Sequence, residues 1–430
     1  MSANLRFRFE WEPIVGVRAP ELRATWARLE AWLDDVCATL VEDVSTGSVR
    51  RSISVPVYPL AEWMVFNWWS ITADGRRSVR SAQRRNVRSA GDGFLWPDLE
   101  IIPTGMDSLV RWNRLRSMRD DPLRYLSYGE RWVDRVSLEE TLTDVIVAVV
   151  SRLREAGIED TPLEKEWMAL QALDAEEVEF CHAAARLGLD PFSEGVDIAT
   201  SIEAVFQALE PRLRDEFLDA AWPDQILPTL DWVRGAFRDA ELAVANGSEG
   251  FSLSLVRSAV GDIHAPDLGA SPWWIGYEAA RLLRDRLGLP PTEPVQAAPV
   301  HVSIREASAS GFTGAGRTSS PDHTNLVIAR HLNRPSERFA IGRALWHAAD
   351  TLPSGSYLIT SSGAATQQVG RAFAAELLAP AAGIRQLLGD QASAAPPEDV
   401  ASVAEHFGAS EWVIAHQVKN QLQDDRDVFR

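Results

Sequence analysis

Cysteine is nearly absent from this 430-residue sequence, which contains only Cys37 and Cys181. The two are far apart in the chain, and neither belongs to a CxxC or Cys/His cluster, so a cysteine-based metal site or redox motif is excluded. A disulfide is uncommon in a reducing compartment. We therefore expect two buried, unpaired thiols that pack as small apolar side chains.

Long apolar runs are absent as well. No run approaches the roughly 20 residues that a transmembrane helix needs. The first residues, MSANLRFRFEWEP, lack the apolar core and cleavage site of a signal peptide. The sequence therefore predicts a cytoplasmic protein without a membrane partner.

Two sequence motifs of common enzymes are also missing. Gly311–Gly316 reads GFTGAG, but no Lys-Ser or Lys-Thr follows it, which excludes a phosphate-binding P-loop. There is no nucleophile elbow of the α/β-hydrolase kind. These two classes of enzyme are therefore excluded.

What is present is the composition of a soluble globular protein, with 46% hydrophobic and 24% charged residues. The length indicates two or three domains. The formal net charge is −18, and residues 150–299 carry most of it, with 27 acidic residues against 12 basic ones. Such a surface repels nucleic acid and attracts basic partners; a well-solvated helical surface is the alternative interpretation.

Hydrophobic periodicity predicts an α+β, multidomain protein with three parts. Residues 1–136 are expected to form a mixed α/β N-terminal domain, 137–290 an acidic, mostly helical domain, and 300–430 a C-terminal α+β domain. The stretch 288–299 holds four prolines and is predicted to be an extended linker.

Individual elements follow from the same patterns, because alternation is typical of strands and apolar residues at helical spacing are typical of helices. The predicted strands are 4–12, 49–58, 99–102, 300–304 and 325–329. The predicted helices are 21–34, 60–69, 138–156, 175–187, 200–220, 225–244, 273–287, 338–349, 368–378, 400–407 and 411–422.

The most basic stretch of the sequence is Gly75–Arg88, which contains six arginines. They are Arg76, Arg77, Arg80, Arg84, Arg85 and Arg88. Guanidinium groups bind phosphate and carboxylate well, so the stretch is a candidate contact for nucleic acid, another anion or an acidic partner. No aromatic residue is interleaved, so the stacking platform of a single-strand binder is missing, and a solvated, mobile loop is the alternative.

Three motifs follow one another in the last 130 residues. They are Arg338-Phe-Ala-Ile-Gly-Arg-Ala-Leu-Trp-His347, Arg371-Ala-Phe-Ala-Ala-Glu-Leu-Leu-Ala-Pro380 and Asp399-Val-Ala-Ser-Val-Ala-Glu-His-Phe-Gly-Ala-Ser410. Their order and spacing resemble the ImmA/IrrE-type metallopeptidases over roughly residues 300–425. The resemblance implies a zincin-like α+β domain that ends in a short helix–turn–helix.

The resemblance also implies a zinc site, whose residues have changed here. In the family, a His-Glu-x-x-His helix supplies two zinc ligands and the general base, and a second helix supplies an acidic ligand. The matching positions in this chain are Arg343 and His347 for the histidines, Ala344 for the base, and Gln367 or Val369 for the acid. One ligand of three remains, and an always-charged arginine repels a divalent cation. We therefore expect neither peptidase activity nor a cofactor.

The polar residues that remain leave several interpretations open. They form an expected pocket of Arg343, His347, Asp350, Arg371 and Glu376. We expect Arg343 to donate hydrogen bonds to a carboxylate or to backbone carbonyls, with Glu376 as the nearest acid, followed by Asp350 and the amides of Gln367 and Gln368. The alternatives are a rearranged zinc site on His347, Asp350 and Glu376, and an anion pocket built on Arg343.

The predicted helix–turn–helix at 399–422 is poor in DNA-reading residues. Its second helix carries one lysine, one histidine and three amides, whereas a DNA-reading helix needs several basic or amide side chains with arginines nearby. We expect a packing role, with His416, Gln417 and Asn420 as candidates for contacting the expected pocket. DNA binding is the alternative.

These observations predict a non-catalytic pseudo-peptidase that binds a protein or a small ligand, as a regulator or accessory subunit. The resemblance implies a bacterial stress, mobile-element or phage-defence setting, because active relatives cleave repressors or antitoxins there. The alternatives are a metal-dependent hydrolase with a rearranged site and a nucleic-acid-binding regulator.

Overall fold

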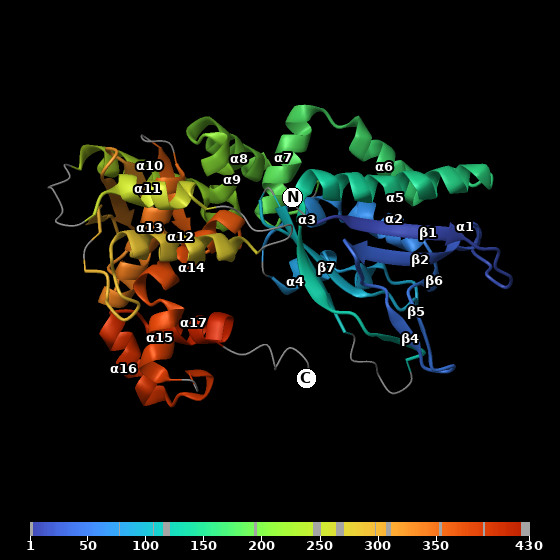
Figure 1. The fold of residues 1–430 in the computed structure, drawn as a ribbon. Helices are drawn as coiled ribbons and strands as arrows, with labels where there is room; N and C mark the ends of the chain where they lie inside the picture. Colours follow the sequence, from blue (N-terminus) through green and yellow to red (C-terminus); the bar gives the residue numbers. More distant parts are fainter. Residues whose placement is uncertain are drawn as a thin grey trace. The chain divides into compact units, whose positions relative to one another are not determined.

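A computed structural model describes residues 3–76, 78–105, 107–114, 121–192, 196–243, 251–263, 271–296, 298–306, 311–351, 355–389 and 392–422. The chain forms two compact units, the first reaching Ala199 and the second beginning at Thr200. Helices and strands occur in both, so the protein is of mixed α+β class, as predicted (Figure 1). None of the described helices is long and apolar enough to cross a membrane.

The strands of the first unit form three antiparallel sheets. The first consists of β1 (Leu5–Trp11), β2 (Trp26–Leu33), β3 (Val36–Cys37) and β6 (Ile53–Pro56). The second consists of β7 (Asp98–Pro103), β8 (Asp107–Asn113) and β10 (Gly129–Asp134). The third consists of β4 (Val41–Asp43), β5 (Ser48–Arg50) and β9 (Leu123–Tyr125). The predicted strands 4–12 and 99–102 are confirmed as β1 and β7.

The predicted helix 21–34 is wrong. Only α1 (Pro20–Ala24) is helical there, and the rest is strand β2, paired with β1 from Leu5 opposite Leu33 onward. Leu29 and Leu33 fit both the helical period and the alternation of a strand. In the structure, the side chains along β2 alternate between buried and less buried. The alternation buries one face of β2, and the neighbouring strands β1 and β6 satisfy its backbone hydrogen bonds.

The helices of the first unit pack on these sheets and on one another. They are α2 (Tyr58–Phe66), α3 (Trp68–Thr72), α4 (Val79–Arg84), the 3₁₀ turn η1 (Val87–Ala90), α5 (Arg135–Glu155), α6 (Pro162–Ala172) and α7 (Ala175–Arg186). The next helix, α8 (Val196–Ala208), contains the division between the units. The predicted strand 49–58 is shorter than expected, because an interruption separates β5 from β6 and α2 begins at Tyr58.

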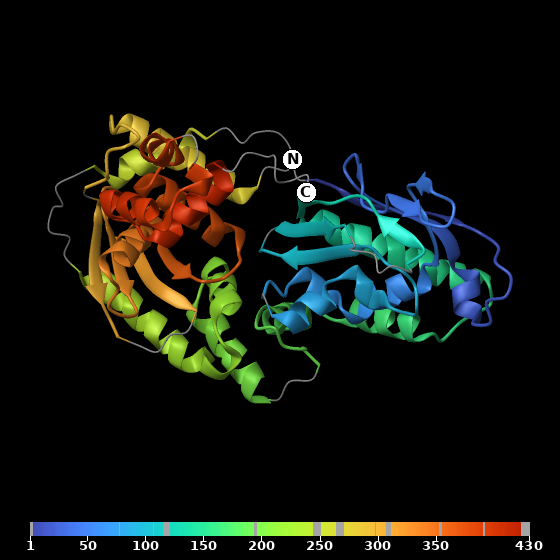
Figure 2. The ribbon, with the colours of Figure 1, turned by 90° about the horizontal axis from the view of Figure 1, so that it is seen from below.

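The second unit is built around one four-stranded sheet in the order β11-β13-β12-β14. These strands are β11 (Val300–Ile304), β12 (Phe312–Thr318), β13 (Thr324–Ile328) and β14 (Ser356–Thr360). β11 runs parallel to β13, and the other pairs are antiparallel. β13 is buried along its whole length, so both faces of the sheet are covered. Figure 2 shows helices on both sides of these strands.

The helices of the second unit are α9 (Pro211–Ala220), α10 (Ile226–Leu242), α11 (Leu253–Gly261), α12 (Pro272–Arg286), α13 (Arg334–Asp350), α14 (Ala365–Leu378), α15 (Ala381–Leu388), α16 (Pro397–Phe407) and α17 (Glu411–Gln417). Short helical turns occupy Pro223–Gln225, Ala392–Ala394 and Val418–Leu422. α13 packs on the sheet, and α14 lies between α13 and α12. α12 and α14 approach closely at Gly276, where a Cβ would lie 2.4 Å from the Val369 carbonyl oxygen.

The two units divide the chain differently from the three predicted segments. The described residues of the middle stretch are mostly helical, as predicted, although a break between α8 and α9 interrupts the predicted helix 200–220. The helices α5–α7 belong to the first unit and α9–α12 to the second. The proline-rich stretch 288–299 contains no helix in its described residues, yet it lies within the second unit. Arg284 holds it by donating to the carbonyls of Pro290 at 2.8 Å and Glu293 at 2.7 Å. This stretch is therefore an anchored loop, and it does not separate the two units.

Candidate functional site

The candidate site begins on α13, which carries Arg343 and His347, the residues that the resemblance aligns with a zinc motif. Its N-terminus is capped by Asn333, whose side chain accepts from the Ser336 amide at 3.0 Å. α13 packs against α14 as predicted, and a Cβ added at Gly342 would lie 2.9 Å from the Cβ of Ala374. This close approach buries Arg343 and His347, which are 5% and 1% exposed.

Arg343 links α13 to its neighbours on two sides. Its Nη2 donates to the Thr360 carbonyl in β14 at 2.6 Å and to Oε1 of Gln367 in α14 at 2.5 Å. The prediction that Arg343 donates to a backbone carbonyl is confirmed, whereas the expected pairing with Glu376 is wrong. The Nε of Arg343 is buried and has no hydrogen-bond partner among the described residues.

Gln367 is the centre of this polar cluster. Besides Arg343, its Oε1 accepts from the Thr360 amide at 3.0 Å. Its Nε2 donates to the Leu358 carbonyl at 2.9 Å and to Oε2 of Glu216 at 3.1 Å. Sequence reasoning missed Glu216, because it lies 151 residues earlier on α9 and no local pattern connects it to the zinc motif.

His347 is buried beside the polar cluster around Gln367, and its imidazole is neutral. Burial lowers the pKa of His347 well below its usual value, and the positive charges of Arg343, Arg212 and Arg371 lower it further. The imidazole stacks on Tyr357 of β14, with ring centroids 6.2 Å apart and planes 9° apart. His347 therefore packs as a buried aromatic side chain beside Gln367.

Glu376, Asp350 and Arg371 of the expected pocket have hydrogen-bond partners other than His347. Glu376 accepts hydrogen bonds from Arg281 at 3.0 Å and Gln417 at 2.7 Å, and Asp350 accepts from Arg212 at 2.5 Å. Arg371 donates to the Ser362 carbonyl at 3.0 Å. Within the described part of the chain, no three His, Cys, Asp or Glu side chains gather as metal ligands would. The rearranged zinc site on His347, Asp350 and Glu376 is therefore not formed.

The described arginines of 76–88 lie in different environments. Arg85 is 2% exposed and donates to the carbonyls of Asp74 and Arg76 and to Glu100 at 3.2 Å. Arg76 donates to the Arg186 carbonyl at 2.8 Å. Arg80 and Arg84 lie on α4 and Arg88 on η1, while Arg77 lies outside the described residues. The stretch is therefore helical over α4 and η1 and buried at Arg85, whereas Arg80 and Arg88 are exposed.

The expected helix–turn–helix is formed by α16 and α17, and one of its candidate contacts is confirmed. Gln417 is buried and donates to Glu376 and, at 3.0 Å, to the Ala379 carbonyl. His416 and Asn420 are exposed, and His416 lies against Trp412 with ring centroids 4.0 Å apart. The second helix thus uses its buried face to pack on α14.

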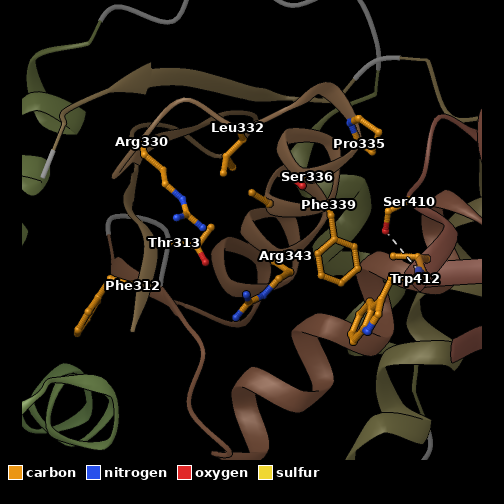
Figure 3. A pocket seen from close by; sticks show the side chains of 12 residues that line it. Phe312, Thr313, Arg330, Leu332, Pro335, Ser336, Phe339, Arg343, Ser410 and Trp412 are labelled. Atoms are coloured by element: carbon orange, nitrogen blue, oxygen red, sulfur yellow. Dashed lines mark hydrogen bonds between the residues drawn. The ribbon is translucent and has the colours of Figure 1, made fainter. Parts of the chain in front are cut away.

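A pocket of about 350 Å³ opens beside Arg343 (Figure 3). It lies between the start of β12, the residues after β13, the first half of α13 and the start of α17. The residues that line it are Phe312, Thr313, Arg330, Leu332, Pro335, Ser336, Phe339, Ala340, Arg343, Ser410, Trp412 and Val413. Two arginines and no acidic residue line this pocket, although the chain holds 61 acidic residues against 43 basic ones.

Glu216 makes the stability of this cluster depend on pH. Burial raises the pKa of Glu216 to about 7, and Arg212 and the hydrogen bond from Gln367 oppose the rise. The folded state then binds this proton more tightly than the unfolded state, so stability is greatest below the unfolded pKa and falls as the pH rises towards 7.

We expect Glu216→Gln to remove this dependence, because the amide does not ionise. Urea unfolding of the wild type should show a loss of about 2 kcal/mol between pH 5 and pH 8 that the variant lacks. A wild type and a variant with parallel pH profiles would refute the assignment.

No protein-family model matches this chain, and no curated protein sequence matches it either.

Proposed function

We propose that the second unit is a metallopeptidase-like domain of ImmA/IrrE type that binds and does not cleave. In this proposal the protein is a non-catalytic regulatory or accessory subunit. A protein or a small ligand is its partner, and bacterial stress, mobile-element or phage defence is its setting. The motifs at 338–347, 371–380 and 399–410 support the family, and the residues around Arg343 support the loss of catalysis.

The observation that carries the proposal is the meeting of positions 343, 347 and 367. The resemblance assigns zinc ligands to positions 343 and 347 and to either 367 or 369. Of these, 343, 347 and 367 come together from α13 and α14, although no sequence pattern other than the motif links them. Arg343 and Gln367 are hydrogen-bonded at 2.5 Å, and a Cβ added at Gly370, three residues after Gln367 on α14, would lie 3.0 Å from Nε2 of His347. This arrangement supports the proposal of a former ligand cluster whose chemistry has changed.

Zinc does not fit the residues that are present. A guanidinium fills the space of the first ligand, and its charge opposes a second cation at that place. Position 344 holds a buried alanine, so no general base stands beside it. His347 is the one side chain of the three that normally ligates zinc in proteins. No hydrolytic step follows from this arrangement.

Restoring the ligands tests the proposal. We expect the combined variant Arg343→His with Gln367→Glu to bind about one zinc per chain in a calorimetric titration, because three ligands would then face one point. The wild type and each single variant should bind none. Circular dichroism checks that all proteins are folded.

A folded combined variant that binds no zinc would contradict the ligand-like placement of these positions. A wild type that binds zinc and loses it on His347→Ala would contradict the proposed loss of catalysis.

A further inference from the structure

The pocket beside Arg343 has two chemically different sides. Figure 3 shows the guanidinium groups of Arg330 and Arg343 on the same side as the Thr313 hydroxyl, and the rings of Phe339 and Trp412 on the other. An arginine side supplies fixed donors for an anion, and an aromatic side supplies a stacking surface. A ligand that satisfies both sides carries an anionic group and a flat ring.

No residue that lines the pocket neutralises the arginine side, although Glu216 interacts electrostatically with Arg343 from outside the lining. Arg343 uses Nη2 for both of its hydrogen bonds, and its buried Nε has no partner among the described residues. Arg330 is exposed, and no ion pair or hydrogen bond of its side chain occurs within the described part of the chain. No acidic residue lines the pocket. Unpaired buried donors are costly, so an anion that accepts from them gains more than it would at a solvated surface.

The aromatic side is formed by one half-buried ring and one exposed ring. Phe339 comes from α13, and Trp412, which is 58% exposed, comes from the start of α17. Large exposed aromatic side chains at a pocket rim are typical of stacking contacts with planar ligands. The volume of about 350 Å³ is that of a site for a small molecule.

We propose that this pocket binds a nucleoside monophosphate, with the phosphate on Arg330 and Arg343 and the base against Phe339 and Trp412. The proposal rests on the proposed function, because it takes the pocket beside the altered zinc motif to be a binding site. Inorganic phosphate would use the arginines alone, and an acidic peptide would leave the rings without a planar partner.

Isothermal titration calorimetry of the full chain with AMP, GMP, adenosine, guanosine and inorganic phosphate tests the proposal. We expect one of the two nucleotides to bind with 1:1 stoichiometry, about tenfold or more tighter than its nucleoside or inorganic phosphate, because it engages both sides of the pocket. Arg330→Ala should weaken this binding about tenfold, the loss of one charge-assisted contact. Trp412→Ala should weaken nucleotide binding and leave any binding of phosphate unchanged.

Arg334→Ala is the matched control for Arg330→Ala. Arg334 is an exposed arginine at the start of α13, and it is not among the residues that line the pocket. Equal affinity for inorganic phosphate and nucleotide, no binding in any arm, or binding unaffected by Arg330→Ala would overturn the proposal. The zinc content of the same preparation tells the failure of the nucleotide site apart from the failure of the proposed function. A protein that holds no zinc and binds no nucleotide overturns the nucleotide site alone.

Discussion

Replacing Glu376 with alanine is expected to destabilise the protein by about 3 kcal/mol, the lower end of the range for breaking a buried ion pair. The Glu376 carboxylate is 1% exposed and accepts hydrogen bonds from Arg281, Gln417 and Gln421, the last at 2.8 Å. These contacts join α12, α14 and the end of α17. Alanine removes the acceptor of the buried Ala381 amide and one acceptor each from Gln417 and Gln421. Gln417 keeps the Ala379 carbonyl, Gln421 keeps the Gln417 side chain, and the half-exposed Arg281 regains water, which limits the loss.

Urea unfolding at pH 7 measures this loss, with Glu376→Gln as the conservative variant. The glutamine keeps the shape of the side chain and one acceptor oxygen but loses the charge opposite Arg281, so we expect a smaller effect than for alanine. Glu405→Ala removes an exposed glutamate from α16 and should leave the midpoint unchanged. Equal midpoints for Glu376→Ala and Glu405→Ala would show that the network contributes nothing to stability.

Replacing Arg343 with alanine is expected to lower the free energy of unfolding by roughly 1–3 kcal/mol, the range for losing a buried charged hydrogen-bond partner. The Thr360 carbonyl and the Gln367 amide oxygen each lose a donor, and a cavity opens between α13 and β14. Burial and the nearby Arg371 lower the pKa of Arg343 to about 9, and Glu216 opposes them. The guanidinium thus remains charged at pH 7, and its hydrogen bonds offset the cost of burying it.

Two variants separate the contributions of charge and of packing at this position. Arg343→Met fills the space without the charge, and we expect it to lose less stability than Arg343→Ala, because apolar residues of similar volume often replace buried charges at little cost. Arg334→Ala changes an exposed arginine on the same helix and should have no effect. If Arg343→Ala matched Arg334→Ala, Arg343 would not bridge the helices as described.

Much of the second unit was predictable because its elements carry strong local signals. The helix over 338–349 and the helix over 368–378 were expected within a few residues, and so was their packing. Strands 300–304 and 325–329 also follow from their apolar runs. Strand β14 had no prediction, because Ser356–Thr360 is short and the sequence gives no sign of its partner β12.

The partners of the site residues were less predictable than their positions. Arg343 was expected to meet Glu376, since both lie near the motif helices in the sequence. The structure pairs Arg343 with Gln367 and Thr360, and joins Glu376 to Arg281, which was assigned to a separate domain. Such long-range contacts depend on how α9 and α12 pack, and a single sequence carries no record of that packing.

The stretch Trp26–Leu33 shows the opposite failure, in which a local signal misleads. Leu29 and Leu33 satisfy both a helical and an alternating pattern, so periodicity alone cannot decide between them. The segment forms a strand because it pairs with β1, and the sequence alone does not reveal that pairing.

The zinc content of the wild-type protein, purified without chelators and measured by elemental analysis, tests the central claim most directly. We expect well below one zinc per chain, together with a melting temperature that EDTA does not change, because the proposed resemblance aligns Arg343 with the first ligand. About one zinc per chain, lost together with several degrees of melting temperature on His347→Ala, would contradict it.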